Sequence, residues 1–404
     1  MKNKTKVVLI FLFLSVFIMA ILSEGQKAKW KGTIEEKDGV KVIKNPKTPL
    51  YGEIELELEV DLSIGGEDVD ENYMFRRVSD IEVDEEGNIY VLDSRECRIQ
   101  IYDKDGKYLK TIGRKGEGPG EFQRAGRMTL GTKDKLYVDE YKKIIIFGND
   151  GTFEKNVNTD FHISSYLVTK EENFLGWSRI RTEKGTSFDV ILIDPSGKRI
   201  DTIASFPDPS VVLTKAVSGG GAISVGGSPP YSPGLFFCPL SDELGIYGYS
   251  AEYKLCVVNS SGEIVHIIEK DEKRQPTSRK EENEYLEKMI ERSKERGGIQ
   301  WSMGDLRKLH GFAKYKPFFS LIINDDEGNI YLAKPKPVVK EEEDTYFDFF
   351  NKEGYYLYKI KIPEISPKVI KKGYLYTFRQ DEDTGYYKIE RYKIKNWGQV
   401  NKGI

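Results

Sequence analysis

A strand–turn–strand pattern recurs along most of this 404-residue chain. The segments IEVDEEGNIYVLD (81–93) and LIINDDEGNIYLA (321–333) each place an acidic turn, closed by glycine, between two apolar runs; MTLGTKDKLYVDE (128–140) is a degenerate copy. A second hairpin follows in each unit, and the turn glycines of these second hairpins are Gly106, Gly151, Gly197, Gly262 and Gly354. The first two intervals between them are 45 and 46 residues. Two hairpins in about 45 residues are typical of a four-stranded propeller blade.

The pattern divides the chain into six units. Five of them cover residues 78–122, 124–160, 162–206, 231–269 and 318–362. The sixth contains only YLYTF (374–378) and YYKIERYKI (386–394), so its outer strand has to come from elsewhere. The strictly alternating EIELELEV (53–60) would complete it and remove an open sheet edge. The sequence therefore predicts an all-β fold, a six-bladed β-propeller of four-stranded blades over residues 51–396, with a small helical insertion.

The loop GRKGEGPGEF (113–122) is rich in glycine and basic residues, as phosphate-binding loops are. Its glycines match neither the dinucleotide fingerprint nor the P-loop spacing, and Pro119 removes a backbone donor. No helical period follows, so no helix N-terminus would face a phosphate. We interpret the loop as the connection from the outer strand of one blade to the inner strand of the next.

Residues 83–122 as a whole resemble one complete repeat of the NHL-repeat-like six-bladed β-propeller proteins, including the G-x-G-P-G-E-F connection. Residues 318–362 resemble the repeat fairly well, and the other blades only weakly. The chain departs from the family after Phe122, where the family usually has proline and this chain has QRAG. The resemblance implies a scaffold or ligand-reading protein. Related six-bladed folds include metal-dependent lyases and lactonases.

The N-terminus is expected to lie outside the propeller. Three lysines precede an uncharged apolar run from Val7 to Leu22, and a polar segment follows. This is the pattern of a secretory signal, with an apolar run that is short for a membrane span. Two alternatives remain: cleavage near residue 25, or retention of residues 1–25 as an anchor that tethers the protein to the membrane through residues 7–22. Both predict an exported protein, periplasmic or extracellular.

The composition argues against nucleic acid as a partner, and it does not decide whether the three cysteines form a disulfide. The formal charge is −3, and becomes −5 when three lysines and Glu24 leave with residues 1–25, which argues against a nucleic-acid binder. Cys97, Cys238 and Cys256 are far apart and form no C-x-x-C motif. We expect buried thiols; one disulfide is the alternative, but the sequence does not choose its pair.

Two insertions and two flanking segments complete the organisation. Residues 207–234 are rich in Gly, Pro and Ser and are expected to form a long loop on one face. Residues 270–316 predict a helix that begins with a capping box of Ser278 and Glu281. Its apolar stripe is expected to pack on the propeller, with partner docking as the alternative; the stripe consists of Tyr285, Leu286, Met289 and Ile290. Residues 26–50 are expected to be an extension and 397–404 a tail.

Signals for catalysis are sparse. The only histidines, His162, His266 and His310, would stand at different distances from the propeller axis, which disfavours a three-histidine metal site. DKDG (103–106) and DEDTG (381–385) do not continue as calcium-binding loops, so turn formation explains them better. No cofactor is predicted. A Ca²⁺ site at the axis, as in lactonase-like propellers, remains an alternative.

One constellation predicts a binding surface. Propellers usually bind ligands on the face formed by loops that enter the inner strand and leave the second strand. Basic, histidine and aromatic residues occupy these positions in successive blades: Arg76, Arg77, Arg95, Arg124, Arg127, His162, Trp177, Arg179, Tyr231, Lys334 and Arg379, with Tyr141 and Tyr249 at two further ones. Arginine recognises carboxylates and sulfates, and aromatic rings suit sugars. The alternative is that the arginines pair with Asp80, Asp93 and Glu96.

The sequence thus supports two classes of function. The first is an exported, non-catalytic binding or scaffold protein for an anionic glycan, peptide or protein partner, expected to be a monomer. The second is an exported metal-dependent lyase or hydrolase of the lactonase-like propeller type. Scarce histidine favours the first class.

Overall fold

The computed structural model describes residues 29–66, 70–131, 135–183, 185–217, 221–295, 302–309, 311–338 and 344–401. The predicted signal or anchor, residues 1–25, lies outside them. No helix within these ranges is long and apolar enough to cross a membrane.

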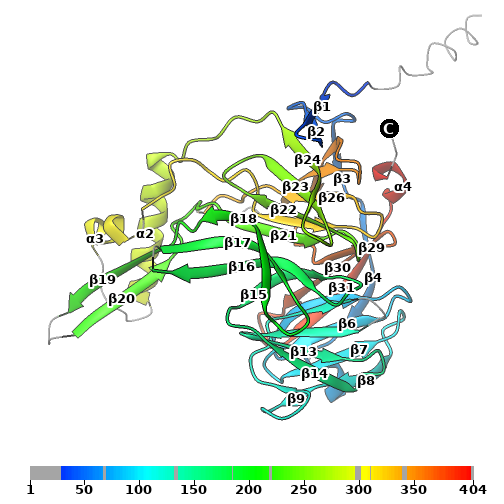
Figure 1. The fold of residues 1–404 in the computed structure, drawn as a ribbon. Coiled ribbons are helices and arrows are strands. Elements are labelled where there is room, and N and C mark those ends of the chain that lie inside the picture. Colours follow the sequence, from blue (N-terminus) through cyan, green and yellow to red (C-terminus); the bar gives the residue numbers. More distant parts are fainter. Residues whose placement is uncertain are drawn as a thin grey trace, which may run out of the picture.

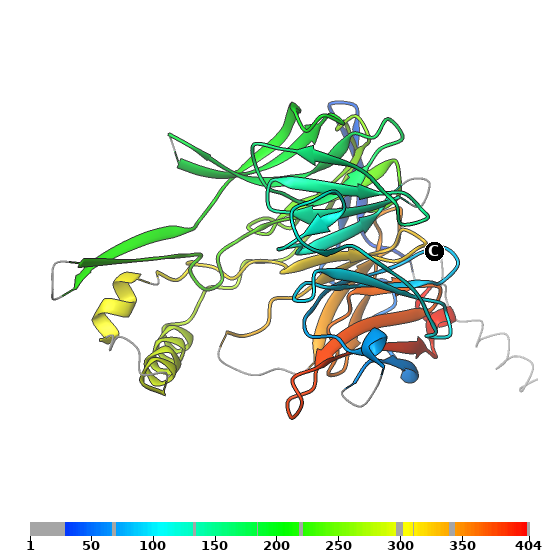
Figure 2. The ribbon, with the colours of Figure 1, turned by 90° about the horizontal axis from the view of Figure 1, so that it is seen from below.

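Six sheets of at least four strands, each built on four antiparallel strands, are arranged around a common axis (Figures 1 and 2). Blade 1 consists of β5 (Val78–Val83), β6 (Ile89–Asp93), β7 (Arg98–Tyr102) and β8 (Tyr108–Ile112). Blade 2 consists of β11 (Arg127–Leu130), β12 (Leu136–Glu140), β13 (Lys143–Phe147) and β14 (Phe153–Asn158). Blade 3 consists of β15 (Ile163–Val168), β16 (Phe174–Thr182), β17 (Gly185–Ile193) and β18 (Arg199–Pro207).

The second half of the ring repeats this order. Blade 4 contains β21 (Leu235–Pro239), β22 (Leu244–Tyr249), β23 (Lys254–Asn259) and β24 (Ile264–Lys270). Blade 5 contains β25 (Leu321–Asn324), β26 (Ile330–Ala333), β27 (Thr345–Phe350) and β28 (Tyr356–Ile362). Blade 6 contains β29 (Val369–Lys371), β30 (Tyr374–Gln380), β31 (Tyr387–Ile394) and β4 (Leu58–Ile64). The sequence pattern had missed β29, a strand of only three residues.

The core lies between blades rather than at one centre. Each of six apolar clusters combines side chains from two neighbouring blades; Leu92 and Phe147, for example, share the cluster between blades 1 and 2. A middle strand such as β6 is buried at every position because another sheet covers each of its faces. An outer strand such as β8 alternates between more and less exposed residues. The amphipathic pattern in the sequence therefore distinguishes outer strands from middle ones.

The turn glycines that define the period have a second role in packing. Gly197 has φ +93°, and a Cβ at this position would lie 2.0 Å from the Asn158 carbonyl oxygen of blade 2. Gly354 is similar: its Cβ would lie 2.7 Å from Ile268 of blade 4. Glycine therefore satisfies both the left-handed turn and the close approach to the preceding blade.

An N-terminal strand completes blade 6 as predicted, but it covers residues 58–64 rather than 53–60. The predicted strand 53–60 is divided: β3 (Glu53–Glu55) pairs in parallel with β28 of blade 5, and β4 pairs antiparallel with β31 of blade 6. The predicted extension 26–50 contains β1 (Thr33–Lys37) and β2 (Val40–Asn45), and β2 adds in parallel to β24 of blade 4. One continuous segment thus adds a strand to three successive blades.

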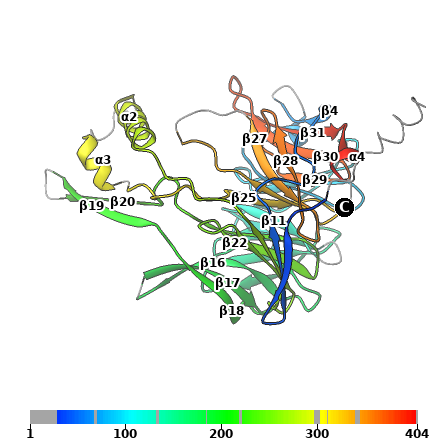
Figure 3. The ribbon, with the colours of Figure 1, turned by 90° about the horizontal axis from the view of Figure 1, so that it is seen from above.

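The two insertions form an arm that stands away from the ring (Figures 1–3). Residues 207–234 are not a loop as predicted, because β19 (Val211–Val217) and β20 (Gly221–Gly227) pair as an antiparallel hairpin. The predicted helix is α2 (Arg279–Glu295), and its capping box is present, with the Ser278 amide donating to Glu281 at 3.1 Å. The sequence also predicts that this helix ends at Gly297 and Gly298, but these two residues lie outside the described ones.

The apolar stripe of α2 packs within the arm, so the expected packing on the propeller is wrong. Leu286 is buried against Leu306 of α3 (Met303–Leu309) and near Phe312. Near the base of the arm, the Glu281 carboxylate accepts hydrogen bonds from Tyr231 and Lys316. Burial acts to raise the pKa of Glu281, but the bonds from Lys316 and Ser278 lower it to about 2.

Short elements complete the structure. In the glycine-rich loop, β9 (Arg114–Lys115) pairs with β10 (Glu121–Phe122), and the loop connects β8 of blade 1 to β11 of blade 2 as the sequence predicted. A 3₁₀ turn (Glu71–Tyr73) precedes β5, and α4 (Trp397–Val400) lies in the predicted tail. All three cysteines are buried and unpaired, so the alternative of a disulfide is not realised.

Candidate functional site

Arginine side chains gather on one face of the ring, which we call the basic face. It is formed by the loops that enter the inner strands and by those that leave the second strands of blades 1 to 3. Arg76 and Arg77 precede β5, Arg95 follows β6, and Arg124 precedes β11; all four are exposed. These loops lie on the same face because neighbouring strands of a blade run in opposite directions, so the start of the first strand and the end of the second lie at the same end of the blade.

A buried carboxylate positions the first group of arginines through their backbone. Asp93, which is fully buried at the end of β6, accepts the backbone N–H of Arg76 at 2.9 Å and of Arg77 at 3.0 Å. It also accepts the N–H of Arg95 at 3.3 Å. Four backbone donors, including that of Glu96, thus surround this carboxylate. The pairing of Asp93 with arginine side chains that the sequence offered as an alternative is therefore wrong.

Blade 2 repeats this arrangement. Glu140 ends β12, the strand equivalent to β6, and one of its oxygens accepts the N–H groups of Gln123 at 2.5 Å and Arg124 at 2.8 Å. Its second oxygen pairs with Lys143 at 2.7 Å. The guanidinium of Arg124 is thereby left exposed, and no ion pair to it is found among the described residues.

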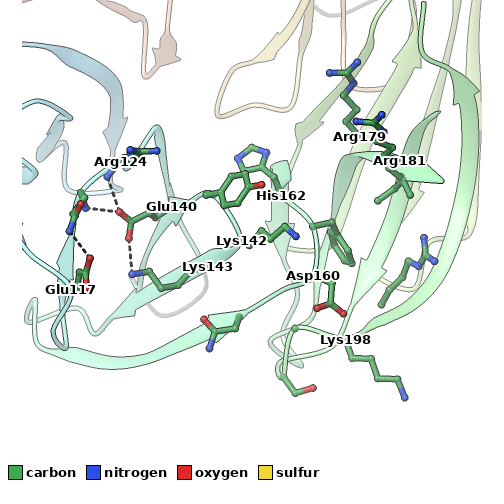
Figure 4. Close-up of a pocket in the computed structure, with 18 of the residues that line it drawn as sticks. Glu117, Arg124, Glu140, Lys142, Lys143, Asp160, His162, Arg179, Arg181 and Lys198 are labelled. Atoms are coloured by element: carbon green, nitrogen blue, oxygen red, sulfur yellow. Dashed lines mark hydrogen bonds and ion pairs between the residues drawn. The ribbon is translucent and has the colours of Figure 1, made fainter. Parts of the chain in front are cut away.

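A large cavity lies between blades 2 and 3, with a volume of about 1760 Å³. Arg124 stands at one end, Arg179 and Arg181 extend from β16 at the other, and His162 lies between them (Figure 4). Further basic residues of the lining are Lys142, Lys143, Lys198 and Arg199, and the acidic ones are Glu117, Glu140 and Asp160. Basic side chains therefore outnumber acidic ones in a chain of negative net charge.

The two arginines at the β16 end of this cavity differ in whether they form an ion pair. Arg179 pairs with Asp208, whereas Arg181, two residues further along the same strand, is exposed and has no ion pair among the residues placed by the structure. Desolvation, followed by the charge of Arg127, lowers the pKa of His162 below its usual value. His162 is therefore neutral at pH 7 and can donate or accept a hydrogen bond.

A second, smaller cavity of about 390 Å³ lies where blades 6 and 1 meet. Arg76, Arg77 and Arg95 line it together with Ser94, Gln380 and Tyr387. The Arg76 guanidinium lies 4.6 Å from the ring centre of Tyr386. The loops that line the two cavities touch below the surface, because the buried Cys97 thiol, two residues after Arg95, donates to the Gln123 carbonyl, next to Arg124, at 3.4 Å.

Arg127 is exposed at the start of β11 and lies near acidic side chains as well as near His162. Its charge acts on Asp80, Glu82 and Asp139, whose pKa values are raised mainly by burial. Burial and the neighbouring Asp80 raise the pKa of Glu82 to about 8, and burial raises that of Asp139 to about 7. Arg127 thus compensates buried carboxylates of the inner strands.

Four other predicted site residues are engaged elsewhere. Trp177 packs edge-on against Phe188 in the apolar cluster between blades 3 and 4. Tyr231 is buried at the base of the arm. Lys334 pairs with Glu272 at 2.8 Å, and Arg379 pairs with Glu390 at 2.7 Å. The structure therefore does not bring all eleven predicted residues into one site.

Sequence reasoning missed several residues of the large cavity. Arg181 could have been found, because residues two apart on a strand share a face and Arg179 was already selected. Lys198 and Arg199 belong to the outer hairpin of blade 3, which is not one of the loops expected to form the binding face. The turn of that hairpin lies against blade 2, since a Cβ on Gly197 would lie 2.0 Å from the Asn158 carbonyl oxygen, and this brings both residues to the cavity.

Two of the histidines lie in different places, because His162 lines the large cavity and His266 belongs to β24 of blade 4. His310 is outside the described residues. No group of three His, Cys, Asp or Glu side chains in the described ranges has an arrangement suited to holding a metal ion.

Comparison with known proteins agrees with the fold. A family model described as a 6-bladed beta-propeller (DUF5128) matches residues 69–216. The chain is a six-bladed β-propeller. No curated protein matches it. Membership of the NHL-repeat family stays a prediction.

Similar solved structures include a Bacteroides fragilis protein, provisionally described as exported, with 15% identity, a TM-score of 0.49 and coverage of 87% of this chain and 100% of that one. A DUF4221-family member from Bacteroides vulgatus has 12% identity and a TM-score of 0.49, and the match covers 84% of this chain and 98% of that one. Virginiamycin B lyase from Staphylococcus aureus has 11% identity and a TM-score of 0.39, and the match covers 83% of this chain and 99% of that one. At these identities the likeness concerns the fold alone.

Proposed function

We propose that this propeller is an exported, non-catalytic binding protein that holds a carboxylated or sulfated ligand on its basic face. The observation that carries the proposal is the engagement of Asp93 and Glu140 by backbone N–H groups. Both carboxylates lie beside arginines, and among the described residues neither forms an ion pair with the side chain of Arg76, Arg77 or Arg124.

Chemistry supports an anion as the ligand. A guanidinium presents a planar set of donors that matches carboxylate and sulfate oxygens, and a contact of this kind contributes about 1.5–3 kcal/mol. Several such groups in neighbouring cavities would attract an anion despite the negative charge of the whole chain. The ligand can belong to a glycan, a peptide or a protein partner. Export rests on the apolar run after the N-terminal lysines.

Titration calorimetry on the protein from residue 26 onward tests the proposal. The probes are polygalacturonate, heparin and poly-glutamate, with dextran and poly-lysine as neutral and cationic controls. We expect at least one polyanion to bind at 20 mM NaCl, and its affinity to fall steeply by 300 mM because salt screens exposed charges. Binding that favours poly-lysine, or no polyanion binding at low salt, would overturn the proposal.

Metal analysis of the same preparation tests the alternative of a metal-dependent lyase or hydrolase. We expect no stoichiometric metal. One tightly bound Ca²⁺ or Zn²⁺ per chain, together with cleavage of a bound polymer, would replace the binding function by a catalytic one.

A further inference from the structure

Tyr141 occupies an unusual position in the large cavity. It is the first residue of a two-residue turn, Tyr141–Lys142, between the paired residues Glu140 of β12 and Lys143 of β13. Its φ is +53°, in the left-handed region, and 70% of the residue is exposed. Its ring borders the same space as Arg124, His162 and Arg181.

The hairpin turn explains the positive φ of Tyr141, but it does not explain why a tyrosine stands at this position. Two-residue hairpin turns favour positive φ at the first position, where Asn, Asp or Gly is usual. A bulky residue in this region is strained, and such strain persists at functional sites. An exposed tyrosine gains little from burial in return. The turn Asp38–Gly39 between β1 and β2 shows the ordinary solution, with φ +51° at an aspartate.

We propose that Tyr141 is the stacking platform of the large cavity, and that the ligand is a linear polysaccharide carrying carboxylate or sulfate groups. This inference rests on the proposed anion-binding function and names the ligand within it. A sugar ring presents a face of C–H groups that packs on an aromatic ring, while its acidic groups meet Arg124 at one side and Arg181 at the other. An acidic peptide has charges of the same sign but no ring to stack.

The size of the cavity favours a polymer over a single sugar. Its volume of about 1760 Å³ exceeds the roughly 300–1,000 Å³ of ordinary small-molecule sites. The loops that line the second cavity, where blades 6 and 1 meet, touch those of the first at the buried contact of Cys97 with Gln123. A chain with repeated acidic groups can engage both cavities at once.

The variant Tyr141→Gly separates the effect of the strained backbone at this position from the effect of the aromatic ring on binding. Glycine relieves the positive φ, so the variant should melt at a slightly higher temperature than the wild type, yet its affinity for the wild-type glycan ligand (polygalacturonate or heparin) should fall at least tenfold. Tyr141→Phe keeps the ring and should retain affinity within about threefold. Asp38→Gly, on the outer edge of blade 4, is the matched control: it makes the same backbone change and should leave binding unchanged.

Calorimetry with polygalacturonate, heparin and poly-glutamate distinguishes the outcomes. Tight binding of a glycan, weak binding of poly-glutamate and the loss in Tyr141→Gly support the inference. Glycan binding that survives in Tyr141→Gly, or poly-glutamate binding as tight as that of the glycans, would overturn it while leaving the anion-binding function intact. Absence of binding to every polyanion would overturn both.

Discussion

The two faces of the ring use carboxylates differently. On the basic face, Asp93 accepts backbone N–H groups of the loops that carry arginines. On the opposite face, where the first and second strands of each blade are joined, Asp84 accepts from the backbone and side chain of Asn88, both at 2.7 Å. Asp325 of blade 5 repeats this contact with Asn329 at 2.9 and 3.0 Å.

The opposite face has an acidic cavity in which both lysines are held in ion pairs. Its cavity, of about 590 Å³, is lined by Glu82, Glu85, Asp242, Glu243, Asp325 and Asp326 together with Lys170 and Lys371. Lys371 pairs with Glu85 at 2.7 Å, and Lys170 pairs with Glu243. The difference shows that charge count alone does not identify a site. What matters is whether the cations are themselves held in ion pairs, as Lys170 and Lys371 are and Arg124 and Arg181 are not among the described residues.

The largest effect should come from removing cations on the basic face. We expect Arg124→Ala combined with Arg181→Ala to lower affinity for the bound polyanion about a hundredfold at 20 mM NaCl, since each charge-assisted contact contributes about 1.5–3 kcal/mol. Lys170→Ala with Lys371→Ala removes the same charge from the opposite face and should leave affinity unchanged. Equal losses in both double variants, measured by calorimetry, would show that only net charge matters.

A smaller effect is expected from the buried carboxylates that organise each face. Asp93→Ala and Asp84→Ala should each lower the free energy of unfolding by about 1–3 kcal/mol, because buried donors lose their acceptor. Only Asp93→Ala should also weaken polyanion binding severalfold, since it frees the loops that hold Arg76, Arg77 and Arg95. Denaturant unfolding and calorimetry on both variants provide the test; unchanged binding in Asp93→Ala would contradict the role given to this residue.

The pH dependence of the free energy of unfolding should reveal the titration of the Glu82 carboxyl group. Burial, then the charge of Asp80, raises the pKa of Glu82 to about 8, so the native state binds a proton that the unfolded state releases near pH 4 to 5. This stabilisation is complete below that range and is lost as the pH rises through about 8. Glu82→Gln should therefore be more stable than the wild type by about 1–3 kcal/mol at pH 9 and nearly equal to it at pH 4. A difference that does not change with pH would exclude this titration.

The smallest effect is expected at an exposed ion pair of the opposite face. Glu85→Ala removes the partner of Lys371 and Lys372 at a side chain that is 70% exposed. Exposed pairs contribute about 0–1 kcal/mol, so the melting temperature should change little and binding not at all. A tenfold loss of polyanion affinity in this variant would show that the two faces are coupled.

The ring could be predicted because its signal is local and repeated. Apolar alternation, the acidic turns and the glycine at 106, 151, 197, 262 and 354 are each specified within a few residues. The alternating direction of the strands then assigns every loop to a face, so the positions of Arg76 and Arg124 followed from strand order. Segments that depend on distant partners were predicted less well. The strand 53–60 is divided between blades 5 and 6 because β28 and β31, each roughly 300 residues away, offer two different edges.

By itself, the sequence determined the number of blades, the side on which the arginine loops lie and the helix that begins at Ser278, because hydrophobic period, strand order and capping act over short distances. Only the tertiary structure decided which arginines remain available. Asp93 and Glu140 could have bound side chains or backbone, and the choice depends on how neighbouring strands place donors around a buried carboxylate. The exposure of Tyr141 in a strained turn also required the tertiary structure, since backbone angle and solvent access are set by the blades around it.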